Sequence, residues 1–400
     1  MTTLSLAWRY LWSRPLGAAL NLLLLSLGLA SITFLLLLGH QLGRAFDRYL
    51  AGIDLVVGAK GSPLQLILSG VLHLDVPTGN VPLQAVQALE QNPLVASVIP
   101  ISLGDSFQGF RIVGTSHAYP AHYQASLAQG SLWQAPMQAV LGASAARALG
   151  VQVGSSFVGS HGLGAGGHTH GDLPYAVTGI LAPTGSVLDR LILTDTASVW
   201  KVHESATALD ADDQKILEQE RELTLALVRY RSPLAAVSLP RFVNSSTEMQ
   251  AAAPALEISR LLRMLGVGTE VLRALAGVLL LTAALSVFLA LWSAVRERRA
   301  DLALLRMLGA PPRRVAALLL SEALWLGVLA AVLGVALGQG LLALLGHLLA
   351  LDQSLLIGGL VWPPELGWVP ALALGVSLAA ALLPTLGAYR VSVQELLQPR

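Results

Sequence analysis

Four long runs of apolar residues dominate the hydrophobic pattern of this 400-residue chain. They cover residues 16–39, 274–294, 315–345 and 366–389. The first has 24 residues, which make about 36 Å of α-helix, enough to cross a hydrocarbon core of about 30 Å. The apolar core of a secretory signal is shorter, with about 7–15 residues, so we expect the run to stay as an anchor. The pattern predicts one transmembrane helix near the N-terminus and three near the C-terminus.

The stretch 40–270 has the mixed polarity of a water-exposed domain. It contains 14 Lys or Arg and 18 Asp or Glu, which give a net charge of −4 with neutral histidines. Short β-rich apolar segments alternate in it with short helical ones, so we predict a large α+β domain. Strands are expected at 55–57, 95–99, 110–113, 176–181, 191–193 and 223–230, and helices at 82–91, 144–149 and 251–263. The last helix is expected to run toward the second span.

Arginine is concentrated in the short segments that border the apolar runs. Two Arg precede the first run, six lie in 296–314 and two lie in 390–400, whereas 347–365 contains no Lys or Arg. The positive-inside rule places the arginine-rich segments in the cytoplasm. We therefore expect a multi-pass protein of the bacterial inner membrane whose large domain lies in the periplasm.

The predicted divisions of the chain follow from these patterns. They are a cytoplasmic amphipathic segment 1–15, a transmembrane helix 16–39, a periplasmic α+β domain with stalk helices 40–270, a transmembrane helix 271–294, a cytoplasmic helix or loop 295–314, a transmembrane helix 315–345, a periplasmic loop 346–365, a transmembrane helix 366–389 and a cytoplasmic tail 390–400.

Two segments allow alternative interpretations. Residues 4–14 alternate apolar and polar positions at helical spacing, which fits either a helix on the inner leaflet or an extension of the first span. Residues 209–222 are polar and acidic, which fits a solvated helix or loop, or a face that docks a partner.

Composition excludes several classes of protein. The chain is 54% hydrophobic and 12% charged, whereas about a quarter of the residues are charged in soluble proteins. A net charge of +1 argues against binding to nucleic acid, and the lack of Cys excludes disulfide frameworks and Cys nucleophiles. The sequence has no phosphate-binding loop, H-E-x-x-H or G-x-S-x-G motif. We therefore predict that the chain is not itself an enzyme.

The cytoplasmic segment 295–311 reads VRERRADLALLRMLGAP. It predicts a short amphipathic helix that ends at Gly309, with Leu302, Leu305 and Leu308 on one side. The sequence resembles the R-x-R-R-x-[ED]-[IL]-A-x-L-[RK]-x-[LM]-G-A segment of the FtsX/MacB-like ABC transporter permeases, which include LolC and LolE. Residues 140–154, 177–181 and 384–397 also resemble stretches of that family, and the order of spans and domain is the same.

The resemblance implies a permease of the mechanotransmission type. In such proteins a separate cytoplasmic ATPase binds and hydrolyses ATP, and the segment after the second span docks on it. The residues expected to carry this coupling are Arg296, Glu297, Arg298, Arg299, Leu302, Leu304, Leu305, Arg306 and Gly309. Only 15 residues precede the first run, so no ATPase like the one fused to MacB is expected there.

The family also implies other partners. These are a second permease copy, as a homodimer or a related pair, a periplasmic binding or substrate protein, and membrane lipids. The alternative is a signal transducer that transports nothing and activates a periplasmic partner enzyme.

A glycine-rich loop of the predicted domain carries His161, His168, His170 and Asp172. Neutral imidazoles with a nearby carboxylate are suitable ligands for Zn²⁺, and also for Cu²⁺ or Ni²⁺. A metal-linked function is therefore one interpretation, and a solvated surface loop is the other. Separately, Glu322 is the only ionisable residue inside the four runs. It is expected either to hold helices together or to serve transport.

Overall fold

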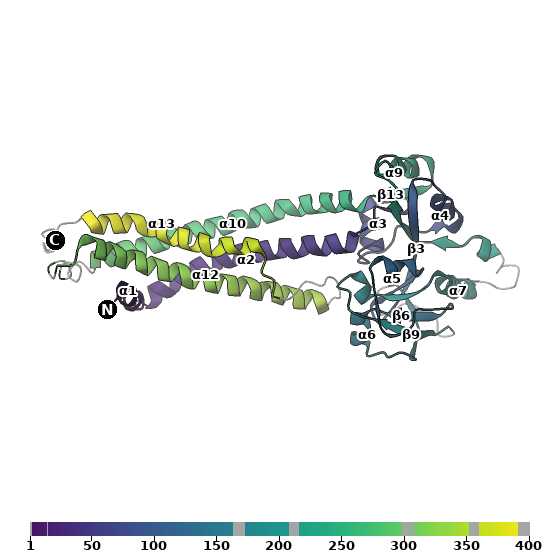
Figure 1. The fold of residues 1–400 in the computed structure, drawn as a ribbon, viewed down its shortest axis with the longest axis horizontal. Coiled ribbons are helices and arrows are strands. Elements are labelled where there is room, and N and C mark those ends of the chain that lie inside the picture. Colours follow the sequence, from purple (N-terminus) through teal and green to yellow (C-terminus); the bar gives the residue numbers. More distant parts are fainter. Residues whose placement is uncertain are drawn as a thin grey trace. The chain divides into compact units, whose positions relative to one another are not determined.

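The computed structural model describes residues 2–13, 15–162, 173–207, 216–297, 304, 307, 309–351 and 360–390. The chain forms two compact units. One combines Met1–Gly43 with Met264–Arg400, and the other is Arg44–Arg263. The first consists of long helices and the second is built on a mixed sheet (Figure 1).

In the described part of the chain, four helices are long and apolar enough to cross a membrane. They are α2 (Pro15–Leu50), α10 (Pro254–Glu297), α12 (Pro312–Leu351) and α13 (Trp368–Arg390), the last preceded by the 3-10 helix η2 (Pro364–Gly367). The predicted fold of one and three spans around an α+β domain is confirmed. Both α2 and α10 continue well beyond their apolar runs, so each contains residues of both units.

A separate short helix, α1 (Thr3–Leu11), precedes the first span. Thr2 caps it, and α2 begins only at Pro15, whose fixed φ suits the first turn of a helix. The interpretation of this segment as an extension of the first span is therefore wrong. The Trp8 and Trp325 rings are 4.9 Å apart, and Trp325 Nε1 donates to the Leu4 carbonyl at 3.2 Å, so α1 packs on α12.

The second unit is built on one large mixed sheet. Its strands run in the order β13-β1-β12-β3-β4-β10-β6-β9-β5, with β7 paired to β9 and β8 paired to β3. The pairs β4–β10 and β6–β9 are parallel and the others are antiparallel. The strand bounds are β1 Leu55–Ala59, β3 Val95–Phe107, β4 Phe110–Thr115, β5 Leu127–Gly130, β6 Gln138–Leu141, β7 Ser156–Phe157, β8 Ser160–His161, β9 Tyr175–Leu181, β10 Ile192–Asp195, β12 Leu225–Tyr230 and β13 Met249–Ala252. A small second sheet pairs β2 (Val81–Pro82) with β11 (Glu222–Leu223).

Each half of the large sheet has its own core. In the half that contains β1 and β12, α4 (Leu83–Glu90) and α9 (Ala235–Ser246) bury Val86, Leu89, Leu239 and Val243 against the strands. In the half that contains β6, β9 and β10, residues of α6 (Ala143–Leu149) and α7 (Thr196–Thr207) complete the core. Two further short helices are α3 (Pro63–Gly70) and α5 (Ala118–His122).

Every predicted strand overlaps an observed one, and the helices expected at 82–91 and 144–149 correspond to α4 and α6. The helix expected at 251–263 is partly wrong. Ala251 and Ala252 belong to β13, where they pair with Val57 and Val56, and α10 begins only at Pro254. Alanine favours helix by itself, but pairing with a buried strand overrides this weak preference.

A histidine just after α3 is buried in the second unit. His73 has a φ of 55°, and its Nε2 is 2.8 Å from the Tyr119 hydroxyl. Burial, and then the positive charges of Arg111 and Arg190, lower the pKa of His73 well below its usual value of 6.5. The folded domain therefore holds this side chain neutral at a pH where the unfolded chain binds a proton.

We predict that acid destabilises this unit through His73. Because the folded pKa is depressed, the free energy of unfolding is greatest above about pH 6.5 and falls below it, by at most about 1.4 kcal/mol per pH unit. Thermal unfolding of the purified chain, followed from pH 7.5 to 5.5, measures the effect. His73→Gln keeps a polar group near Tyr119 and should flatten the profile, and equal acid losses in both proteins would contradict the prediction.

Candidate functional site

The segment after α10, which the sequence predicts to be cytoplasmic, has exposed apolar side chains. Leu304 and Met307 are helical, lie one turn apart and are 55% and 62% exposed. Gly309 follows with a φ of +89°, the left-handed conformation that glycine adopts readily when it ends a helix. Both apolar side chains are therefore accessible to a partner protein.

Of the other residues predicted to carry coupling, Arg296 and Glu297 form the exposed end of α10. Arg298, Arg299, Leu302, Leu305 and Arg306 lie outside the described residues. Their role therefore stays a prediction, and Leu304 is the one leucine of the set that falls within the described residues.

An apolar cluster of the helical unit begins in the first turns of α12, which follow this segment in the chain. Val315 and Leu319, in the first turns of α12, are buried in it. Helices α1, α2, α10 and α13 contribute to the same cluster, with Leu11, Ala18, Val287, Leu291, Ala380 and Ala381. Because such cores are close-packed, a displacement of the first turn of α12 must move its neighbours.

Polar and small residues fix the packing deeper in the unit. Ser286 Oγ donates to Asn21 Oδ1 at 2.6 Å, which ties α10 to α2. Gly334 of α12 packs so closely on α2 that a Cβ there would lie 2.6 Å from the Leu29 Cβ. Interhelical hydrogen bonds and small residues are the usual means of helix association in lipid.

Glu322 is buried in α12, with 3% of its surface exposed, and it has an interaction partner within the protein. It lies beside Ala323 and one turn from Leu319, both members of the apolar cluster. A buried, partnered carboxylate in this position fits a role in helix packing, although neither of the two expected roles is tested by this placement.

Most of the predicted metal ligands lie outside the part of the chain that the structure describes. His168, His170 and Asp172 lie outside the described residues, and for His161 the backbone alone is described, as part of β8 paired to Asp105 of β3. Within the ranges that are described, no group of three or more His, Cys, Asp or Glu is placed to hold a metal ion. The metal site stays a prediction.

Two family models match the chain. The model of the MacB-like periplasmic core domain matches residues 18–235, which is more than half of the chain, and the model of the FtsX-like permease C-terminal matches residues 273–393. The chain belongs to the MacB/FtsX-like permease family. The permease is accordingly a multi-pass inner-membrane protein, and the sheet unit is its periplasmic domain.

Curated relatives are similar at low identity. The permease is 25% identical over 361 residues to the pyoverdine export ATP-binding/permease protein PvdT of Pseudomonas entomophila, covering 85% of this chain and 52% of that protein. The corresponding protein of Pseudomonas putida is 24% identical over 361 residues, covering 84% of this chain and 51% of that protein. The permease therefore spans about half the length of the curated relatives it matches.

Two solved structures are also similar to the permease. The periplasmic region of MacB from Actinobacillus actinomycetemcomitans is 14% identical, covers 54% of this chain and 95% of its own, and gives a TM-score of 0.36. The extracellular domain of the ABC-type transporter YknZ from Gram-positive bacteria is 10% identical, covers 50% of this chain and 98% of its own, and gives a TM-score of 0.31.

Proposed function

We propose that the permease couples ATP hydrolysis on a separate cytoplasmic ATPase to movement of its periplasmic domain. The observation that carries this proposal is the exposed Leu304–Met307 pair in the segment whose sequence resembles the family's ATPase-docking segment. An apolar anchor flanked by arginines suits a protein interface, since aromatic residues, Met and Arg are enriched in such contacts.

The path of the movement follows from the packing of the helices. A displacement of residues 304–309 is expected to reach Val315 and Leu319 within two turns of α12, and from there the shared apolar cluster. That cluster includes α2 and α10, the helices that also contain residues of the periplasmic unit. Long uninterrupted helices transmit such a displacement because their backbone hydrogen bonds resist local deformation.

Partner capture tests the proposal. A tagged permease, extracted in mild detergent from its native host, is expected to retain a cytoplasmic ATP-binding subunit and a second copy of the permease or a related one. Recovery of the permease without any ATP-binding subunit, under conditions that preserve its fold, would contradict it.

We also propose that the loop with His161, His168 and His170 binds Zn²⁺, with Asp172 assisting. Calorimetric titration of the full chain with ZnCl₂ should show saturable binding, which the triple His→Ala variant loses. Equal heats of Zn²⁺ binding in the unchanged protein and the variant would show that other residues bind the metal, which would overturn this proposal. The proposal on ATPase coupling would be unaffected.

A further inference from the structure

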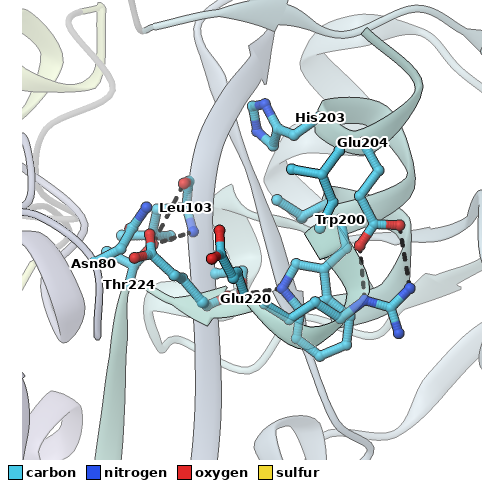
Figure 2. Close-up of a pocket in the computed structure, with 12 residues that line it drawn as sticks. Asn80, Leu103, Trp200, His203, Glu204, Glu220 and Thr224 are labelled. Atoms are coloured by element: carbon cyan, nitrogen blue, oxygen red, sulfur yellow. Dashed lines mark hydrogen bonds and ion pairs between the residues drawn. The ribbon is translucent and has the colours of Figure 1, made fainter. Parts of the chain in front are cut away.

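An acidic pocket opens in the periplasmic domain between α7 and β3 (Figure 2). The start of the predicted metal loop lies next to it on β3, since the Gly162 amide donates to the Gly104 carbonyl, and Gly104 follows Leu103 of the lining. The pocket encloses about 260 Å³, and its lining includes Ser102, Trp200, His203, Glu220, Glu222 and Thr224. The volume is slightly below the range of about 300–1,000 Å³ typical of sites for drug-sized ligands. The pocket is therefore suited to a molecule of amino-acid size.

The polar side chains in one wall of the pocket bind one another or the backbone. Arg221 binds Glu204 through two hydrogen bonds, of 2.7 and 3.1 Å, and its guanidinium lies 5.0 Å from the centre of the Trp200 ring. The Trp200 indole nitrogen donates to the Glu222 carbonyl at 2.7 Å. Figure 2 shows this ion pair beside Trp200. Arg221 is thus already neutralised by a protein carboxylate.

The charge that remains is negative. With Arg221 paired to Glu204, the carboxylates of Glu220 and Glu222 give the lining a net charge of −2. Both residues are exposed, so they stand at the mouth of the pocket, and Figure 2 shows Glu220 between Leu103 and Trp200 in this view. A concave site lined by one sign of charge concentrates ions of the opposite sign.

A buried hydroxyl at the base of the pocket supplies an independent sign of a ligand. Ser102 is 3% exposed, and its Oγ has no hydrogen-bond partner among the described residues. Its side chain stands on the α7 face of the sheet, because a Cβ on the paired Gly114 would lie 3.3 Å from Ser102 Cβ and 2.6 Å from Val199. Leaving a buried hydroxyl without a partner costs about 1–3 kcal/mol.

The neighbouring hydroxyl behaves differently. Thr224 Oγ1 accepts from the Leu103 amide at 2.9 Å and donates to its carbonyl at 3.4 Å. Of these two hydroxyls, the fold satisfies that of Thr224 and leaves that of Ser102 without a partner among the described residues. Ser102 is the one positioned for a ligand.

We propose that the acidic pocket binds a small organic cation. Its ammonium or guanidinium group pairs with Glu220 and Glu222 at the mouth, and a hydrogen-bonding group meets Ser102 Oγ at the base. Anions are disfavoured by the two carboxylates. A metal ion is disfavoured because the described residues offer no group of three ligands. This inference goes beyond ATPase coupling and stands or fails separately from it.

Agmatine, a four-carbon chain with an ammonium and a guanidinium group, is a suitable probe. The full chain, in nanodiscs of zwitterionic lipid, is titrated by calorimetry with agmatine and with neutral butylurea as the matched probe. Saturable binding of agmatine alone is expected. No heat of binding at about 1 mM agmatine, or equal binding of butylurea, would overturn the proposal.

Substitutions in and beside the lining test whether agmatine binds in the acidic pocket. The double change Glu220→Gln and Glu222→Gln should weaken agmatine binding at least about tenfold, which corresponds to about 1.4 kcal/mol. Ser102→Ala should weaken it by about threefold to tenfold without lowering the unfolding midpoint, since it removes a hydroxyl that has no partner. Glu218→Gln is the matched control, because Glu218 belongs to the same segment and is not part of the lining. An equal loss of agmatine affinity in Glu218→Gln, or no loss in the double variant, would show that agmatine does not bind in the acidic pocket.

Discussion

Leu304→Asp is expected to detach the permease from the proposed ATPase subunit. The side chain is 55% exposed, so the change leaves the fold intact, but it puts a charge into the apolar centre of the proposed contact. Apolar anchors at the centre of an interface contribute about 2 kcal/mol or more, so affinity should fall by at least about 30-fold. Stimulation of the ATPase by the permease, measured in nanodiscs over a range of ATPase concentrations, reports this loss.

Two variants make the result specific. Leu304→Met keeps an apolar side chain and should keep most of the stimulation. Leu234→Asp introduces the same charge at a Leu that is 68% exposed in the periplasmic domain, and it should leave ATPase binding unchanged. Full stimulation in Leu304→Asp would show that this segment is not the contact.

Gly334→Leu is expected to have the second large effect, on the helical unit itself. A Cβ at this position meets the Leu29 Cβ at 2.6 Å and the Ser26 carbonyl at 3.2 Å, so α2 and α12 must separate to admit a side chain. Overpacking of this kind costs about 1–3 kcal/mol, and more where backbone is in the way.

The unfolding midpoint of the permease in detergent measures this cost. Gly340→Leu is the matched control, since Gly340 lies in the same helix with nothing within 4 Å of its Cβ position. It should be neutral or stabilising, because leucine favours helix over glycine. Equal midpoints for the two variants would mean that α2 and α12 do not pack as described.

The sequence alone predicts those parts of the fold that depend on one dominant physical signal. Long apolar runs identify spans because a helix is the simplest way to satisfy the backbone in lipid, and the runs at 16–39 and 315–345 lie inside α2 and α12. Alternating apolar positions likewise predicted strands such as 176–181, which lies inside β9. The cap at Gly309 was also predictable, since glycine commonly ends helices there.

Features set by distant partners were not predictable. Ala251 and Ala252 form a strand because β1 lies beside them, and nothing local in the sequence signals that pairing. The parallel pairing of β4 with β10 joins segments about 80 residues apart through a crossover, which hydrophobic periodicity does not specify.

The acidic pocket was likewise not predictable from the sequence, because it depends on residues that are distant in the chain. The sequence of residues 209–222 indicates only a solvated segment or a docking face. The pocket exists only because the fold brings Ser102, Trp200 and Glu220 together from three separate segments. The available signal was the density of acidic residues near Trp200, which does not by itself indicate a site.

The most direct test of ATPase coupling measures movement of the periplasmic domain. The chain has no Cys, so labels on Val237→Cys in that domain and Leu360→Cys in the membrane unit attach only where intended. Energy transfer between them is compared for the complex with its ATPase, without nucleotide and with ATP trapped on a hydrolysis-deficient ATPase. We predict that trapping ATP shifts the distance distribution and that Leu304→Asp abolishes the shift. Identical distributions in both states, with the ATPase still bound, would contradict the central claim.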